Sequence, residues 1–266
     1  IYQYTVSASQ GGTEISVVAS GYVGNTLYKM NHEMSGDRTF HLAGDSTNYY
    51  IQQKLEETFA GTLNIVGRTQ DKKDTIIATS STDTDTTKGL SMFEVVNNGT
   101  ILNIKDITIE QAESENGGSV IYQNNANSTV NVKNSTLQNN TTSADGGAVS
   151  VNSGTAAFDD VTFSENSADR AGALRVSGGR VAIIDSEFTN NTATRYGGAI
   201  ATPHSASDPH SEIMLTIDGT TFSGNKVTSN SNSGGGAISL GDNITAIIAD
   251  STFRGNSSET NGGAVY

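Results

Sequence analysis

The strongest constraint on the fold is an internal repeat. Six segments, starting at residues 102, 130, 156, 181, 215 and 246, can be aligned with one another. Each contains a short strand of alternating apolar residues, then Asp or Asn (Gly219 in the fifth unit), and an aromatic or aliphatic residue that is followed after two positions by Asn in all but the first unit. A polar stretch, a Gly-Gly-Ala corner (Gly-Gly-Ser in the first unit and Ala-Gly-Ala in the third) and a second short strand complete the unit. Apolar residues alternate, as at Val181 and Ile183, which excludes helical repeats. One unit cannot bury its own apolar face, whereas units stacked about 4.8 Å apart bury a continuous column. The repeat therefore predicts an all-β fold, a right-handed parallel β-helix.

Each repeat position has an expected structural role. The aromatic residue points inward and stacks on the next coil, burying about 150–250 Å² per ring. The Asn lies at a turn, tolerates a left-handed backbone and forms an amide ladder between coils. The glycine pair lies at a corner that needs positive φ, and the small residue after it faces a narrow interior. The structural motif residues are Phe163, Asn166, Phe188, Asn191, Phe222, Asn225, Phe253, Asn256, Gly147, Gly172, Gly198, Gly236 and Gly263.

A column of acidic residues precedes the aromatic position and leaves two readings open. It contains Asp106, Asn134, Asp160, Asp185 and Asp250, and Gly219 interrupts it. The first reading is a turn in which the side chain accepts nearby main-chain N–H groups. The second is a line of calcium ligands, because hard cations favour stacked carboxylates.

The repeat also divides the chain into regions. Residues 97–266 form the regular coils, and residues 41–96 form irregular coils with alternating segments such as GTLNIVG, DTIIATS and SMFEVV. Residues 1–40 lack the motif, and we expect them to form an N-terminal cap with the first strands, since an open end exposes core and strand edge. Because the last repeat is cut short, we expect a fragment of a longer exported protein.

Charge and composition exclude several functions. No cysteine is present, which excludes disulfides, a thiolate metal site and a cysteine nucleophile. The net charge of −13 repels nucleic acid and anionic membranes. No apolar run approaches the roughly 20 residues of a membrane span, so we expect no direct membrane insertion of this chain. We expect no cofactor either.

One insertion departs from the repeat. The segment TPHSASDPHSE, at 202–212, contains both prolines and two of the four histidines. Loops that leave a rigid scaffold often carry function, and we predict that this loop binds a partner. A metal is the alternative, but it needs further ligands that spacing does not reveal, so we predict no metal site. The predicted binding residues are His204, Ser205, Asp208 and His210.

The motifs FSEN (163–166), FTNN (188–191), FSGN (222–225) and FRGN (253–256) alternate with GGAV or GGAI at 146, 197, 235 and 262. This pattern resembles the chlamydial polymorphic membrane proteins and related autotransporter passengers. The resemblance implies an adhesin at the bacterial cell surface, anchored in the outer membrane or secreted. It further implies attachment to a host-cell surface receptor or glycan, and self-association.

Parallel β-helices also carry polysaccharide lyases and glycoside hydrolases, so the fold alone does not assign a function. A glycosidase needs two carboxylates about 5–10 Å apart in a groove, whereas the recurring carboxylates here share one turn position. A lyase needs a basic residue beside a cation, and arginines recur at Arg170, Arg175, Arg180 and Arg195. We favour an adhesin without catalytic residues over a polysaccharide-active enzyme, and over a purely structural stalk.

Overall fold

The structure is a computed structural model of the 266-residue chain. It describes residues 4–9, 12–17, 21–22, 37–42, 48–52, 61–68, 71, 74–79, 91–204, 212–231, 233–242 and 244–266. For 4–9, 12–17, 21–22 and 48–52, and at positions 38 and 79, it describes the backbone alone.

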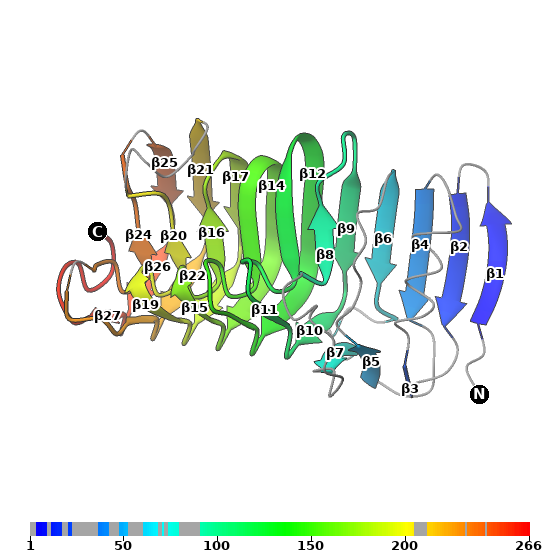
Figure 1. Cartoon of the computed structure of the whole chain (residues 1–266), viewed down its shortest axis with the longest axis horizontal. Coiled ribbons are helices and arrows are strands. Elements are labelled where there is room, and N and C mark those ends of the chain that lie inside the picture. The colour runs from blue at the N-terminus through cyan, green and yellow to red at the C-terminus, as the bar shows by residue number, and fades with distance from the viewer. Residues whose placement is uncertain are drawn as a thin grey trace.

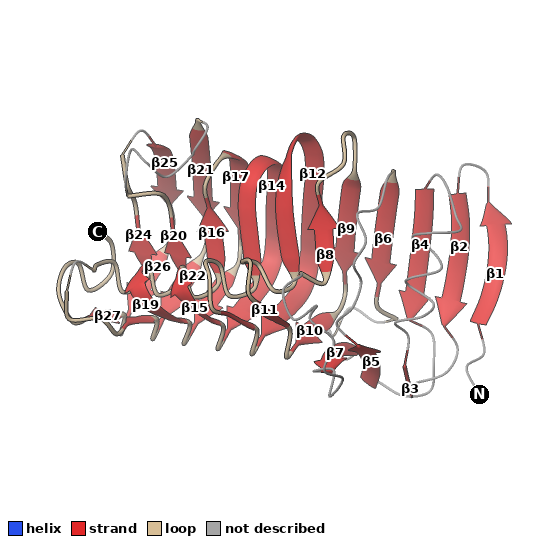
Figure 2. Cartoon of the chain, in the orientation of Figure 1, coloured by secondary structure: helices blue, strands red, loops and turns tan. Residues whose placement is uncertain are grey.

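The described chain is an elongated stack of β-strands without a helix (Figures 1 and 2). One 21-stranded sheet winds around the stack, and a 6-stranded sheet closes the coils along one edge. Successive coils pair in parallel from β2 onward. The predicted parallel β-helix, a β-solenoid, is confirmed.

The longest side of the coil is a ladder that runs from one end of the molecule to the other (Figure 1). Its strands are β2 (Gly12–Val17), β4 (Asp37–Leu42), β6 (Thr62–Val66), β9 (Ile101–Lys105), the middle parts of β12 (Ile121–Gln138) and β14 (Val149–Ser164), β17 (Gly179–Ile184), β21 (Ile213–Asp218) and β25 (Ile244–Ala249). Inward residues lie in register, as at Val181 and Leu215. Their alternation with outward residues gives the burial pattern that the sequence predicts.

A second side carries the aromatic position. It contains β3 (Gly21–Tyr22), β5 (Asn48–Gln52), β7 (Thr75–Thr79), β10 (Thr108–Glu110), the ends of β12 and β14, β18 (Glu187–Thr189), β22 (Thr221–Ser223) and β26 (Thr252–Arg254). The third side contains β8 (Phe93–Val95), the starts of β12 and β14, β16 (Leu174–Val176), β20 (Ile200–Ala201) and β24 (Ile238–Ser239).

The 6-stranded sheet joins the second side to the third. Its strands are β11 (Glu113–Ser114), β13 (Thr141–Thr142), β15 (Ser167–Arg170), β19 (Thr192–Tyr196), β23 (Lys226–Val227) and β27 (Ser257–Ser258). The glycine corner follows each of these strands and turns the chain into the third side.

The N-terminal region begins with the one antiparallel pair among the described strands, between β1 (Tyr4–Ser9) and β2. The ladder continues through the predicted boundary at residue 40, because β4 crosses it and pairs in parallel with both β2 and β6. Whether residues 1–40 cover the first coil depends on side chains that lie outside the described residues.

The aromatic column fills the interior. Phe163, Phe188 and Phe222 are fully buried. The ring centroids of Phe163 and Phe188 lie 4.5 Å apart, and those of Phe188 and Phe222 lie 5.0 Å apart. Phe253 stacks at 4.8 Å on Phe222 and remains partly exposed in the final coil. Phe158 packs edge to face on Phe163, with ring centroids 5.4 Å apart and ring planes at 70°.

The asparagine column is a buried hydrogen-bonded ladder. Each side-chain amide donates through Nδ2 to Oδ1 of the Asn one coil further on, at 2.9–3.0 Å. The same Oδ1 accepts the main-chain N–H of the preceding Asn. The ladder therefore satisfies main-chain and side-chain groups that no water reaches. Its members are Asn140, Asn166, Asn191, Asn225 and Asn256.

The left-handed residue of this turn is not the Asn. The residue before it has positive φ: Glu165 at 56°, Asn190 at 56° and Gly224 at 66°. The expectation that the ladder Asn supplies the left-handed backbone is wrong. That Asn keeps an ordinary φ because its side chain must point into the coil, where its bonding partners lie.

The glycine corner combines two different requirements. The first residue of each pair has positive φ, including Ala171 at 56°, so our expectation holds there. The second glycine has positive φ only in the first pair, at Gly118 (50°), so in the other five pairs the expectation is wrong for it. A Cβ on Gly198 would overlap the main-chain oxygen of Gly236 in the next coil, and Gly147, Gly172 and Gly236 have the same environment. These four glycines are therefore required by close approach between coils, whereas a Cβ on Gly263 would meet only Asn256 O, at 3.6 Å.

The acidic column marks another left-handed turn. Asp106, Asn134, Asp160, Asp185 and Asp250 have φ between 43° and 60°, and Gly219 takes the same conformation at 60°. Asp and Asn tolerate this conformation better than most side chains. The next residue is often a buried hydroxyl, and Ser186 Oγ donates to Ile184 O at 2.7 Å while accepting from Val161 N. This turn chemistry explains the column without a cation.

Candidate functional site

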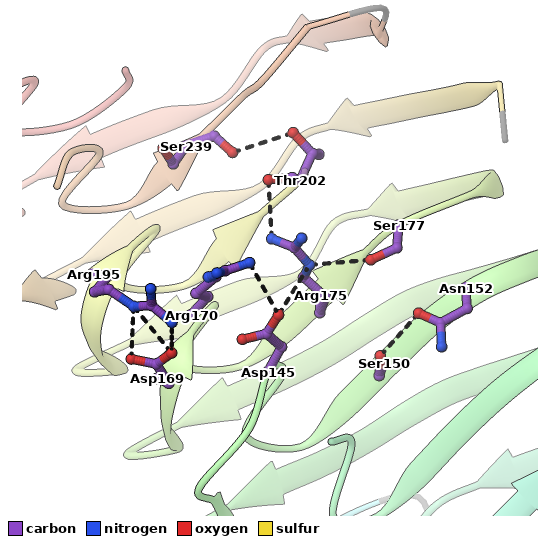
Figure 3. A network of polar contacts seen from close by, with 10 residues as sticks. All are labelled: Asp145, Ser150, Asn152, Asp169, Arg170, Arg175, Ser177, Arg195, Thr202 and Ser239. Carbon is purple, nitrogen blue, oxygen red and sulfur yellow. Dashed lines mark hydrogen bonds and ion pairs between the residues drawn. The ribbon is translucent and has the colours of Figure 1, made fainter. Parts of the chain in front are cut away.

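The outer side of the glycine corner gathers charged side chains from successive coils (Figure 3). Isolated bridges pair Asp145 with Arg170, and Tyr196 with Gly234, at the position before the corner. We call Asp145, Asp169, Arg170, Arg175 and Arg195 the arginine cluster.

Arg175 lies at the centre of the cluster. It stands between Leu174 and Val176, which are fully buried in the core, so strand alternation directs its side chain outward. It is nevertheless only 3% exposed. Its Nη1 donates to the main-chain oxygen of Thr202 at 2.9 Å, and its Nε donates to Ser177 Oγ at 3.1 Å. Arg175 therefore connects its own coil to the first residue of the insertion.

Two carboxylates accompany the arginines. Asp145 Oδ2 lies 3.6 Å from Arg175 Nε and 3.8 Å from Arg170 Nη1. Burial raises the pKa of Asp145, and the charges of Arg175 and Arg170 oppose that rise. Arg195 forms a two-pronged ion pair with Asp169: its Nε lies 3.0 Å from both carboxylate oxygens, and its Nη2 donates to Oδ2. This geometry holds charge in place through charge-assisted bonds.

An aromatic stack adjoins the cluster. The ring of His204 lies 4.3 Å from that of Tyr196 and 6.1 Å from that of Tyr266, nearly parallel to both. Its Nε2 lies 2.8 Å from Ser239 Oγ. Burial lowers the pKa of His204, and Arg175 and Arg170 lower it further. We call Tyr196, His204 and Tyr266 the aromatic stack.

The predicted binding loop is described only in part. His204 is half-buried, and its ring packs on the scaffold. Ser205, Asp208 and His210 lie outside the described residues, so the prediction of a binding loop stays a prediction. Within the described ranges, no group of three or more His, Cys, Asp or Glu side chains could hold a metal ion.

The structure unites three of the four arginines noted in the sequence. Arg180 lies elsewhere, with Nη1 3.2 Å from Met214 Sδ, beside a hollow lined by Ala126, Gly154 and Glu212. Sequence reasoning missed Asp145 and Asp169 as partners. Their positions in the repeat alignment were a usable signal, because Asp145 and Arg170 occupy the same place before successive glycine corners.

A second hollow lies on the acidic column, where Gly219 interrupts it. Asp160, Asp185, Glu187 and Arg254 line it. The hollow therefore presents three carboxylates and one guanidinium.

Comparison with known protein families identifies the repeat. The model of the Chlamydia polymorphic membrane protein repeat matches residues 185–203 and 250–266. The first range contains FTNN and GGAI, and the second contains FRGN and GGAV. Comparison with curated proteins and with solved structures finds no match. In the part of the chain that the structure describes, no helix has the length and apolarity to cross a membrane. The chain therefore carries two segments that match the Chlamydia polymorphic membrane protein repeat, on a parallel β-solenoid.

Proposed function

We propose that the chain is a surface-exposed passenger segment that attaches to a host-cell receptor or glycan and associates with further copies of itself. The family repeat on a β-solenoid carries this proposal, because the two together fit an autotransporter-like passenger. A location at the bacterial cell surface, with an outer-membrane anchor or after secretion, belongs to the same proposal.

The repeat motifs contribute to attachment indirectly, by stabilising the fold. The stacked Phe rings and the Asn ladder are buried except in the final coil, where Phe253 and Asn256 are half-buried, and the second glycine packs against the next coil at Gly147, Gly172, Gly198 and Gly236. The buried side chains are therefore closed to a receptor. Contacts with a partner fall to the outward columns, where side chains differ from coil to coil, and to the insertion at 202–212.

Attachment is testable with beads coated with the chain and incubated with cultured host cells. Folded chain should retain cells, and chain unfolded in urea before coating should not. The variant Gly198→Ala, which disturbs coil stacking without changing an outward side chain, should lose retention in proportion to its loss of folded protein. Equal retention by folded and unfolded chain would contradict the proposal. Sedimentation at rising concentration tests self-association.

A further inference from the structure

The arginine cluster is a positively charged patch on a negatively charged protein. It sets three guanidinium groups against two carboxylates in a chain whose net charge is −13. Burial is the main cause of the lowered pKa of His204 beside the cluster; Arg175 and Arg170 lower it further, and Asp242 opposes them. An acidic protein that concentrates positive charge in this way attracts an anion to one place on its surface.

Arg195 presents this charge to solvent. Its bonds to Asp169 use Nε and Nη2, whereas a guanidinium carries five N–H donors. The side chain is 43% exposed, so the Nη1 edge is open to a ligand. Arg175, by contrast, is buried, so it adds positive charge to the site without contacting the ligand. A planar donor edge beside fixed positive charge matches a carboxylate or a sulfate group.

The aromatic stack begins one residue after Arg195. Tyr196 and His204 are both half-buried, and their rings stack with centroids 4.3 Å apart. Aromatic rings at a wet surface offer an apolar body together with a polar group. The faces of sugar rings are apolar and their rims carry hydroxyls, so rings of this kind complement them.

We propose that the arginine cluster and the aromatic stack together bind an acidic glycan. The carboxylate or sulfate group bonds to the open edge of Arg195, and a sugar ring packs beside it against Tyr196 and His204. The inference rests on the proposed attachment function and names the class of ligand. Figure 3 shows the charged half of this surface, with Arg195, Asp169 and Arg170 on one side of Arg175.

The test compares immobilised polysaccharides as probes. Hyaluronan presents carboxylates, heparin presents sulfates as well, and dextran presents neither. The folded chain should bind at least one acidic probe and not dextran, and binding should weaken with salt because the contact is ionic. Preference between the two acidic probes identifies the anionic group. Binding to dextran as strong as to both acidic probes, or no binding to any, would overturn the inference.

Variants locate the site. Arg195→Ala should weaken acidic-glycan binding at least about tenfold, since a charge-assisted hydrogen bond is lost. Arg180→Ala is the matched control, because Arg180 is an exposed arginine outside the cluster, and it should leave binding unchanged. Tyr196→Ala is a second variant, which removes a half-buried ring of the stack that is not part of the hydrophobic core, and it should weaken binding too. Equal loss in Arg180→Ala and Arg195→Ala would refute the assignment.

Cell attachment, measured in parallel, separates this inference from the broader proposal. If the chain retains cells, neither acidic probe competes and Arg195→Ala is unimpaired, attachment stands and the glycan site fails. If the acidic probes bind at Arg195 but cells are not retained, the glycan site stands and attachment fails. Circular dichroism spectra and melting temperatures of the variants confirm that each remains folded.

Discussion

Removal of one rung from the asparagine ladder tests the account of how the coils are held together. Asn191 is fully buried, with the rungs of Asn166 and Asn225 on its two sides. Its Nδ2 donates to Phe163 O at 2.9 Å and to Asn225 Oδ1 at 2.9 Å. Its Oδ1 accepts from Asn166 N and Asn166 Nδ2, both at 3.0 Å. Asn191→Ala removes all four bonds and no apolar packing.

The cost follows from the groups left behind. Asn166 Nδ2 retains Leu137 O, and Asn225 Oδ1 retains the main-chain N–H of residue 191. The main-chain N–H of Asn166 and the oxygen of Phe163 lose the bonds that Asn191 supplied. A buried donor or acceptor without its bond costs about 1–3 kcal/mol, so we expect roughly 2–6 kcal/mol for the two. Water entering the space moves the result toward the lower value.

The matched control is the half-buried last rung. Asn256→Ala also removes bonds to Asn225 N and Phe222 O, but solvent can replace them there, so we expect a loss of about 1 kcal/mol. Urea unfolding followed by circular dichroism gives both values, and hydrogen exchange of peptides spanning residues 163–193 locates the weakened coil. A loss of stability in Asn191→Ala no larger than that in Asn256→Ala would refute the role of the ladder.

Asn191→Asp changes the hydrogen bonding of this rung and keeps the shape of its side chain. The aspartate keeps the acceptor but turns a charged oxygen toward Phe163 O and Asn225 Oδ1. Burial raises its pKa in the folded state above the unfolded value of about 3.9. The variant should therefore be most stable below pH of about 4 and lose stability as pH rises through the folded pKa. A stability profile parallel to that of the unmodified chain would contradict this reasoning.

Three further predictions concern the corner. Ala199→Leu should overpack the interior and cost about 1–3 kcal/mol, with an unchanged melting temperature counting against an inward Ala199. Gly198→Ala should cost about 3 kcal/mol because its Cβ meets the next coil, whereas Gly263→Ala, without such a neighbour, should cost far less in the same urea titration. The pKa of His204 is lowered on folding, so the unfolded state binds more protons and stability should fall as pH drops through about 6.5. His204→Gln should remove this part of the pH dependence, measured by melting across that range.

The repeat alignment predicts the coil stacking because each column has one environment throughout. Phe163, Phe188, Phe222 and Phe253 pair in the structure as they align in the sequence. Backbone conformation was harder to predict, since Asn and Gly serve left-handed turns and close packing alike. Glu165 has a left-handed backbone conformation, which its residue type does not predict. Gly198 has an ordinary φ, so the glycine at this position does not mark a left-handed turn.

The arginine cluster escaped prediction for a different physical reason. An outward column has no common environment, so residue type at one coil says nothing of the next. Asp145, Arg170 and Tyr196 share a column yet differ in charge and shape. Their meeting with Arg175 also depends on the corner angle, which brings side chains before and after the glycines onto one surface (Figure 3).

The same contrast explains how one repeat could serve different partners. Inside the coil, the Asn and second-glycine columns contact their own kind in the next coil, so a change there affects two interfaces at once. Outside, replacing Arg195 alters one ion pair with Asp169 and no stacking contact. Binding preference can therefore vary along the outer columns at little cost to folding. Arg195→Ala should accordingly change glycan binding far more than stability, whereas Asn191→Ala should do the reverse, losing binding only as it unfolds. Both variants should therefore be measured for glycan binding and for urea unfolding. If Arg195→Ala loses as much stability as Asn191→Ala, Arg195 contributes to the stability of the scaffold and not to binding.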